Sequence, residues 1–326
     1  MPADVAPLPA GIYCPVITFF DDSAAQALDL KLHEQHCEML AAAGCHGVVV
    51  MGSTGEAVTL SREERKQLVR GAKAAVSRAA LPNSPGLIIA GTVGAQSTQQ
   101  AIELAVDAAA EGADYILVLP PSYYPGPMTN DALQGFFEDV ADASPIPLII
   151  YSYPAVSGGI NMDTDLLGAL ARHPRIVGIK HTDHDVGKIA RLAAQDFGSP
   201  FTVLGGATDY ILGTLAYGGE GAITGMANVA PRVCVEIFNL YNAGKHAEAL
   251  KYASVVSRAE WSLGRGGILG TKWAVTYANG YPEKSALARK PLPLCPEAAK
   301  AYVRSECEGV LALEKELAKA AGVNGV

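Results

Sequence analysis

Residues 176–180 read Ile-Val-Gly-Ile-Lys, and this short run decides how the rest of the sequence is interpreted. A nearly continuous apolar run is typical of a strand in a parallel sheet that is buried on both faces. Lys180 ends the run, so it is expected at the carboxyl end of the strand, at the edge of the core. Desolvation there favours the neutral amine, which can attack a ketone to form a Schiff base. The ordinary alternative is a lysine whose ammonium reaches water.

Further apolar runs rich in β-branched residues recur along the chain, separated by segments with helical periodicity. The expected strands are residues 13–19, 47–51, 87–90, 115–119, 148–151, 176–180, 201–204 and 222–224, and the expected helices between them include 30–43, 62–79, 98–110 and 131–141. Alternating strands and helices of this number predict an α/β fold, a (β/α)8 TIM barrel. A doubly wound open sheet is the alternative, but it normally has a glycine-rich turn after its first strand, where this chain has Phe20-Asp21-Asp22.

The pattern changes near Pro231, after which helical segments are expected at 233–243, 247–261 and 295–321 with no strand between them. We therefore predict a catalytic barrel over residues 1–231 and a C-terminal helical domain over residues 232–326. Residues 264–267, Gly-Arg-Gly-Gly, lack both the preceding strand and the Lys-Ser/Thr ending of a phosphate loop. A simple turn is expected there.

Composition narrows the class of protein. The chain has 326 residues and a net charge of -8 with no basic patch, which argues against nucleic acid or an anionic membrane as a partner. Its six cysteines form no C-x-x-C pair and are expected to be reduced thiols. The amino terminus carries no signal-peptide or transit-peptide pattern, and no apolar run approaches the ~20 residues of a membrane span, so a cytoplasmic location is expected. His181 and His184 have no carboxylate cluster beside them, and we predict neither a metal nor a cofactor.

Residues that follow the strands are the candidates for chemistry, because barrel enzymes build their active sites at the carboxyl ends of the strands. Residues 52–56, Gly-Ser-Thr-Gly-Glu, combine two hydroxyls with glycines and suit a small carboxylate, although an ordinary turn reads the same way. Residues 120–125 place paired tyrosines among prolines, and Tyr151 ends the fifth strand. A phenol there can relay a proton, whereas a packed tyrosine is the common case. Together with Lys180 these groups favour carbonyl chemistry through a Schiff base.

These motifs in this order resemble the dihydrodipicolinate synthase and N-acetylneuraminate lyase superfamily. The matching stretches are residues 52–56, 151–154 (Tyr-Ser-Tyr-Pro), 178–180 (Gly-Ile-Lys) and 219–221 (Gly-Glu-Gly), and the similarity runs from Gly11 to the C-terminal helices. The resemblance implies a (β/α)8 barrel with a helical C-terminal domain, usually a homotetramer built as a dimer of dimers. It also implies class I aldolase chemistry with pyruvate.

The resemblance also assigns roles to residues. It makes Lys180 the Schiff-base lysine, Tyr151 the proton shuttle, Ser53 and Thr54 the pair that holds the pyruvate carboxylate, with Thr54 also in the proton relay. Tyr124 matches a tyrosine that reaches into the site of a neighbouring subunit. The full set of expected site residues is Lys180, Tyr151, Thr54 and Tyr124 for catalysis and Gly52, Ser53, Thr54, Thr182, Thr208 and Ile223 for substrate binding. Local capping is the alternative for the polar residues 182, 183, 208 and 209.

One departure from the family pattern bears on the substrate. Synthase members carry an arginine about five residues after the tyrosine that matches Tyr151, where it binds a second carboxylate, and this chain has Val156 there. Loss of that guanidinium removes bidentate capture of a carboxylate. The chain looks more like the 4-hydroxy-2-oxoglutarate aldolase and fungal 2-keto-3-deoxy-sugar-acid aldolase branches. We therefore expect a carbon–carbon lyase that cleaves such a 2-oxo-acid to pyruvate and an aldehyde. The alternatives are 4-hydroxy-tetrahydrodipicolinate synthase, a hydratase-aldolase or dehydratase, and a non-catalytic barrel that binds a 2-oxo-acid.

Overall fold

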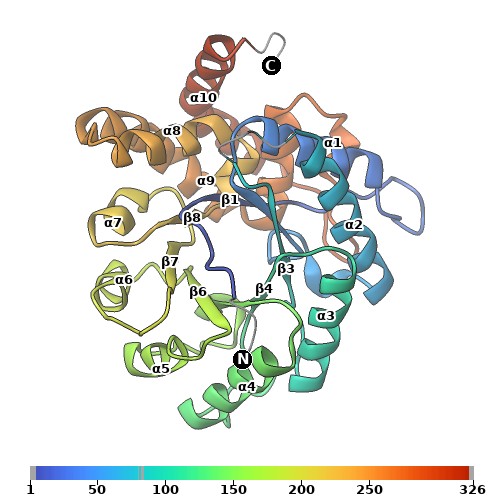
Figure 1. Ribbon diagram of the computed structural model, residues 1–326. Helices are drawn as coiled ribbons and strands as arrows, with labels where there is room; N and C mark the ends of the chain where they lie inside the picture. The colour runs from blue at the N-terminus through green and yellow to red at the C-terminus, as the bar shows by residue number, and fades with distance from the viewer. Residues whose placement is uncertain (1–4, 80, 82–83, 323–326) are drawn as a thin grey trace.

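The structure is a closed barrel of eight parallel strands surrounded by helices (Figure 1). It is a computed structural model that describes residues 5–79, 81 and 84–322. The strands are β1 Gly11–Pro15, β2 Gly47–Val50, β3 Leu87–Gly91, β4 Tyr115–Val118, β5 Leu148–Ser152, β6 Ile176–His181, β7 Thr202–Gly205 and β8 Gly221–Ile223. Each strand pairs with the next in sequence, and β8 closes the barrel on β1. The prediction of a (β/α)8 TIM barrel is confirmed, and every expected strand overlaps an observed one.

A helix follows each strand of the barrel. These helices are α1 Leu30–Ala42, α2 Arg62–Ala79, α3 Thr98–Ala110, α4 Asn130–Ala143, α5 Thr164–Leu170, α6 Val186–Ala193, α7 Ile211–Ala216 and α8 Pro231–Asn242. Short helical turns lie at η1 Ala57–Thr59, η2 Pro154–Val156, η3 Gly225–Asn228 and η4 Glu283–Ala286. Ser61 and Glu64 form a capping box at the start of α2, since the backbone N–H of each residue donates to the side chain of the other, at 2.8 Å and 3.3 Å.

Glycines explain why β7 and β8 are the weakest strands in the sequence pattern. Gly221 has φ 137°, and a Cβ at this position would lie 2.0 Å from the carbonyl oxygen of Gly11 on β1. Only glycine fits a backbone that approaches another strand this closely. The barrel therefore closes at a point where the sequence has few bulky apolar residues to signal a strand.

Two long helices, α9 His246–Ala278 and α10 Glu297–Ala320, pack together beside α8 on one side of the barrel (Figure 1). The expected turn at residues 264–267 is wrong, because α9 continues through this segment with a kink at Gly267 (φ 58°, ψ −158°). Gly266 and Gly270 face Val303 of α10, where an added Cβ would lie at ordinary contact distances of 3.4 Å and 3.6 Å. Since α8 contacts both β1 and α9, the domain boundary between residues 231 and 232 stays a prediction.

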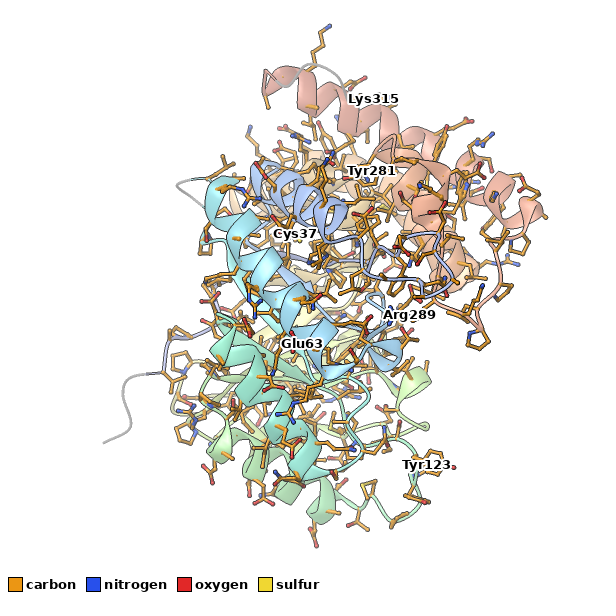
Figure 2. The ribbon with its side chains drawn as sticks, turned by 90° about the vertical axis from the view of Figure 1, so that its right-hand side faces the viewer. Cys37, Glu63, Tyr123, Tyr281, Arg289 and Lys315 are labelled. Atoms are coloured by element: carbon orange, nitrogen blue, oxygen red, sulfur yellow. The ribbon has the colours of Figure 1, made fainter. Side chains whose placement is uncertain are left out.

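Polar contacts fasten these helices to the barrel. Arg289, which precedes α10, donates from its guanidinium to Glu64 of α2 at 2.6 Å and 2.9 Å, and its backbone N–H donates to Glu56 at 2.9 Å. Figure 2 shows Arg289 between the barrel helices and the C-terminal helices. The six cysteines are buried and free, as expected. In the part of the chain that the structure describes, no helix is long and apolar enough to span a membrane.

Candidate active site

A cavity of about 740 Å³ lies at the carboxyl ends of the barrel strands, where active sites of this fold occur. Its lining includes five of the expected site residues, which are Ser53, Thr54, Tyr151, Lys180 and Thr182. Residues of η2 and of the middle of α9 complete its wall. A hollow of similar size, about 730 Å³, lies on the outer surface between α1 and α2 and contains none of the expected residues. The cavity over the strands is therefore the candidate active site.

Lys180 lies on β6 with only 5 % of its surface exposed. Its Nζ lies 4.3 Å from the centre of the Tyr151 ring, and within the described residues no carboxylate forms an ion pair with it. Burial lowers the pKa of Lys180 to about 7, against a smaller opposing effect of the Glu260 charge. A large fraction of the side chain is thus neutral amine near pH 7, which is the reactive form for attack on a carbonyl.

Tyr151 lies on β5, directly beside Lys180 in the register of the two strands. It is 2 % exposed, and burial raises its pKa to about 12, so the phenol stays protonated near neutral pH. Its hydroxyl lies 3.5 Å from Oγ of Ser53, which follows β2 on the other side of the barrel. An amine, a phenol and a hydroxyl therefore meet in one cavity, and this combination suits proton transfer next to a Schiff base.

The loop after β2 presents Ser53 and Thr54 to the cavity. Backbone N–H groups of Gly55 and Ala57 donate to the carbonyl of Gly52 at 3.1 Å and 3.4 Å, so these groups close the turn itself. The loop ends at Glu56, whose φ of 52° is unusual for a residue with a side chain. Its carboxylate is held by Lys272 of α9, and this contact fixes the turn against the C-terminal helices. The hydroxyls of Ser53 and Thr54 are the polar side-chain groups that the loop offers a carboxylate.

Asp183 lines the cavity but is engaged in a buried network. Its Oδ2 accepts hydrogen bonds from Ser152 Oγ and from Lys188 Nζ, both at 2.9 Å, and lies 3.2 Å from His181 Nδ1. Burial opposes ionisation of this carboxyl, but His181 and Lys188 outweigh it and hold the pKa of Asp183 well below its usual range. Asp183 therefore orients the end of β6 and has little capacity left for a substrate hydroxyl.

Four expected site residues do not line the cavity. Gly52 is occupied in the turn described above, and Ile223 is fully buried within β8. Thr208 is also fully buried, and its hydroxyl donates to Thr224 Oγ1 at 2.7 Å, so its contact with substrate stays a prediction. Tyr124 is 71 % exposed and packs edge-on against Tyr123, with ring centres 4.9 Å apart. Its expected role in a neighbouring subunit's site stays a prediction.

The sequence analysis missed Glu260, an acidic residue of the cavity that comes from α9. Its Oε2 accepts hydrogen bonds from the backbone N–H of Thr208 at 2.9 Å and from Thr224 Oγ1 at 3.0 Å. Burial raises the pKa of Glu260 to about 7. No local pattern marks this residue, because it lies inside an amphipathic helix and not at the end of a strand. Asp209, which follows β7, also lines the cavity and was weighed only as a possible contact for substrate hydroxyls.

Comparisons with a family model and with individual known proteins indicate one and the same family. The chain matches the model of the dihydrodipicolinate synthetase family over residues 8–307. It is 43 % identical to a probable mitochondrial 4-hydroxy-2-oxoglutarate aldolase of Emericella nidulans, over 85 % of this chain and 88 % of that protein. It is 40 % identical to an L-threo-3-deoxy-hexylosonate aldolase of Aspergillus niger, over 95 % of this chain and 98 % of that protein.

Solved structures agree with these sequence relatives. A putative dihydrodipicolinate synthase family protein from Coccidioides immitis superposes with a TM-score of 0.85 at 40 % identity, covering 96 % of this chain and 99 % of that one. A prophage protein of the dihydrodipicolinic acid synthase family from E. coli K12, solved in complex with pyruvate, gives a TM-score of 0.82 at 30 % identity, covering 92 % and 98 %. The fold is therefore shared along nearly the whole chain.

Proposed function

Because the chain belongs to the dihydrodipicolinate synthetase family, we propose that it is a class I aldolase that cleaves a 2-oxo-acid to pyruvate and an aldehyde. The observation that carries this proposal is Lys180, a buried lysine that has no acidic partner among the described residues and whose pKa is lowered to about 7. Its neighbour Tyr151 supplies a phenol for proton transfer. The relatives named as aldolases, at 40 % and 43 % identity, support a carbon–carbon lyase.

The proposed reaction begins when the substrate carboxylate binds the hydroxyls of Ser53 and Thr54. The neutral amine of Lys180 attacks the 2-oxo carbon, and loss of water gives an iminium ion. Tyr151, with Thr54 in the relay, gives its proton to the hydroxyl that leaves as water, and the resulting phenolate then removes the proton of the C4 hydroxyl while the electrons of the C3–C4 bond flow to the iminium nitrogen. An aldehyde leaves, the resulting enamine takes a proton at C3, and water releases pyruvate and regenerates the Lys180 amine.

The cavity fits this substrate class better than it fits the synthase reaction. Val156 lines the wall where synthase relatives are expected to have an arginine, so bidentate binding of a second carboxylate is absent at this point. Among the described residues of the lining, Arg265 is the one guanidinium, and it lies 5.6 Å from the ring centre of Tyr302 near the outer end. The relatives named as aldolases suggest two substrates, 4-hydroxy-2-oxoglutarate and a 3-deoxy-hexylosonate.

Borohydride trapping tests the mechanism directly. The protein is incubated with pyruvate, reduced and digested, and the adduct is located by mass spectrometry. We expect one adduct, on Lys180, and none on the equally buried Lys272, which is paired with Glu56. Lys180→Met is the matched control and should give no adduct. A folded protein that takes up pyruvate and yields no lysine adduct would leave a binding protein as the better explanation.

We also propose a homotetramer in the cytoplasm. The paired, exposed side chains of Tyr123 and Tyr124 support a chain that assembles through the loop between β4 and α4, where Figure 2 shows Tyr123 at the surface. Two relatives are named as mitochondrial, so a mitochondrial location is the alternative. Light scattering of the purified protein, repeated for Tyr124→Ser, checks the assembly and the part that this loop has in it.

A further inference from the structure

Glu260 is held rigidly at the edge of the cavity. Thr208 and Thr224, at the ends of β7 and β8, both donate hydrogen bonds to its Oε2, at 2.9 Å and 3.0 Å. Thr224 is itself fixed by the hydroxyl of Thr208 at 2.7 Å. Two hydrogen bonds to one oxygen set the orientation of the whole carboxyl group, so the direction of the other oxygen, Oε1, is also fixed.

Oε1 of Glu260 has no hydrogen-bond donor in the described residues, and no lysine, arginine or histidine there forms an ion pair with this side chain. A partly buried carboxylate without a cation costs stability, and a structural role normally comes with a partner. By contrast, the buried carboxylate of Glu314 forms an ion pair with Arg232 at 3.1 Å. Glu260 is therefore a candidate to bind a ligand.

Two more polar atoms near Glu260 lack partners. Oδ1 of Asp209 and Oγ1 of Thr182 are buried without a hydrogen bond in the described part of the chain. Both residues line the same cavity as Lys180 and Glu260. Two of these three free oxygens belong to carboxyl groups and the third to a hydroxyl, so this part of the wall mainly accepts hydrogen bonds.

Such a wall discriminates between the two substrates that the relatives suggest. The hydroxyl groups of a sugar acid donate hydrogen bonds to carboxylate oxygens. The second carboxylate of 4-hydroxy-2-oxoglutarate has no proton to donate at neutral pH, and the ionised forms of Glu260 and Asp209 repel it. Arg265 is the rival feature, since it is the guanidinium that a dicarboxylate would have to reach.

We propose that Glu260 is a specificity-determining residue whose Oε1 accepts hydrogen bonds from hydroxyl groups on the aldehyde half of the substrate. The enzyme then favours a six-carbon 2-keto-3-deoxy sugar acid over 4-hydroxy-2-oxoglutarate. This inference rests on the aldolase function proposed above. It adds a substrate contact from α9 to a site otherwise built at the ends of the barrel strands.

The test compares kcat/KM for the two substrates in three proteins, with pyruvate release followed by lactate dehydrogenase and NADH. The wild type should prefer the sugar acid. Glu260→Gln keeps the shape of the side chain but removes its charge, and the preference should fall by about tenfold or more, which is the difference between a charged and a neutral hydrogen bond. Glu248→Gln changes an exposed carboxylate on the same helix and should leave the preference unchanged.

A second variant at this position, Glu260→Asp, keeps the charge of the side chain but shortens it. It should lose the hydrogen bond, and with it sugar-acid cleavage, while it still rejects the dicarboxylate. A wild-type preference for 4-hydroxy-2-oxoglutarate that disappears in Arg265→Gln would overturn the inference, as would an unchanged preference in Glu260→Gln.

Pyruvate trapping on Lys180 is measured in every protein and separates the two proposals. An adduct with unchanged preference contradicts only the role of Glu260. Absence of the adduct in the wild type contradicts the aldolase itself.

Discussion

Two buried lysines of this molecule, Lys180 on β6 and Lys272 on α9, are similarly buried but differ in their hydrogen-bond and ion-pair partners. They are 5 % and 0 % exposed, and each Nζ lies over an aromatic ring, 4.3 Å from the centre of Tyr151 and 4.6 Å from the centre of Phe20. Lys272 donates to the carbonyl of Thr18 at 2.7 Å and to the carboxylate of Glu56. Lys180 has neither kind of acceptor among the described residues.

This comparison shows that burial alone does not produce a nucleophile. Burial lowers the pKa of both lysines, but the charge and hydrogen bond of Glu56 oppose it at Lys272 and hold that ammonium in place. At Lys180 the more distant charge of Glu260 opposes burial only weakly, and the pKa falls to about 7. The paired lysine joins the loop of Ser53 and Thr54 to α9, whereas the unpaired lysine is available for covalent chemistry.

The largest expected effect is on turnover. Lys180→Met should abolish cleavage of either 2-oxo-acid, because no other group can form the iminium ion, while Lys272→Met should retain measurable turnover at a temperature where it is folded. The measurement is kcat in the lactate dehydrogenase assay, with circular dichroism as a check of folding. Equal loss in the two variants, with both folded, would mean that the comparison has assigned the wrong lysine.

Changing the ring beside Lys180 sharpens the same comparison. Tyr151→Phe gives Lys180 a neighbour like the Phe20 ring beside Lys272, with the hydroxyl removed and the packing kept. We expect kcat to fall by roughly 10²- to 10⁴-fold, the usual contribution of a positioned acid or base, while borohydride trapping of pyruvate continues. A near-normal kcat would remove Tyr151 from the proton relay and leave it a packing role.

The third effect is on stability and concerns the paired lysine. Lys272→Met leaves the carboxylate of Glu56 buried without its cation, and loss of one member of a buried ion pair costs about 3–5 kcal/mol. Urea denaturation should show this loss, and the double variant Lys272→Met with Glu56→Gln should recover part of it because the uncompensated charge is gone. A double variant no more stable than the single one would mean that Glu56 is not the source of the cost.

Sequence patterns found the fold and half of the site for a physical reason. A buried parallel strand is a recognisable apolar run, and the residue that follows it must lie at the rim of the barrel, so Ser53, Tyr151 and Lys180 could be placed from the sequence. The family match over residues 8–307 confirms the family that these motifs indicated.

The other half of the site depends on tertiary packing. Glu260 and Lys272 lie on opposite sides of the kink at Gly267, in a segment whose glycines indicate a turn although helix continues on both sides of it. Nothing local in the sequence of α9 indicates which of its residues turns toward the barrel. Thr208 illustrates the converse, because a hydroxyl after a strand pointed to substrate but is used to orient Glu260 through Thr224.

The smallest expected effect is a shift along the pH axis. The rate at which pyruvate is trapped should rise with pH and level off above about 7, because the pKa of Lys180 is lowered to that value and only the neutral amine reacts. Tyr151, with its pKa raised to about 12, stays protonated over this range and does not contribute. Glu260 titrates at about the same pH, so the wild-type profile reflects the coupled titration of Lys180 and Glu260.

Glu260→Gln removes the charge that favours the Lys180 ammonium, so the midpoint of the trapping profile should move to lower pH and follow a single titration. Lys272→Met, measured below its unfolding temperature, should leave the midpoint where the wild type has it, because that lysine belongs to the Glu56 pair. A midpoint that stays fixed in Glu260→Gln would show that the carboxylate is too well screened to act on Lys180. If the wild-type profile had its midpoint near the pKa of an ordinary lysine, the contrast between Lys180 and Lys272 would be contradicted.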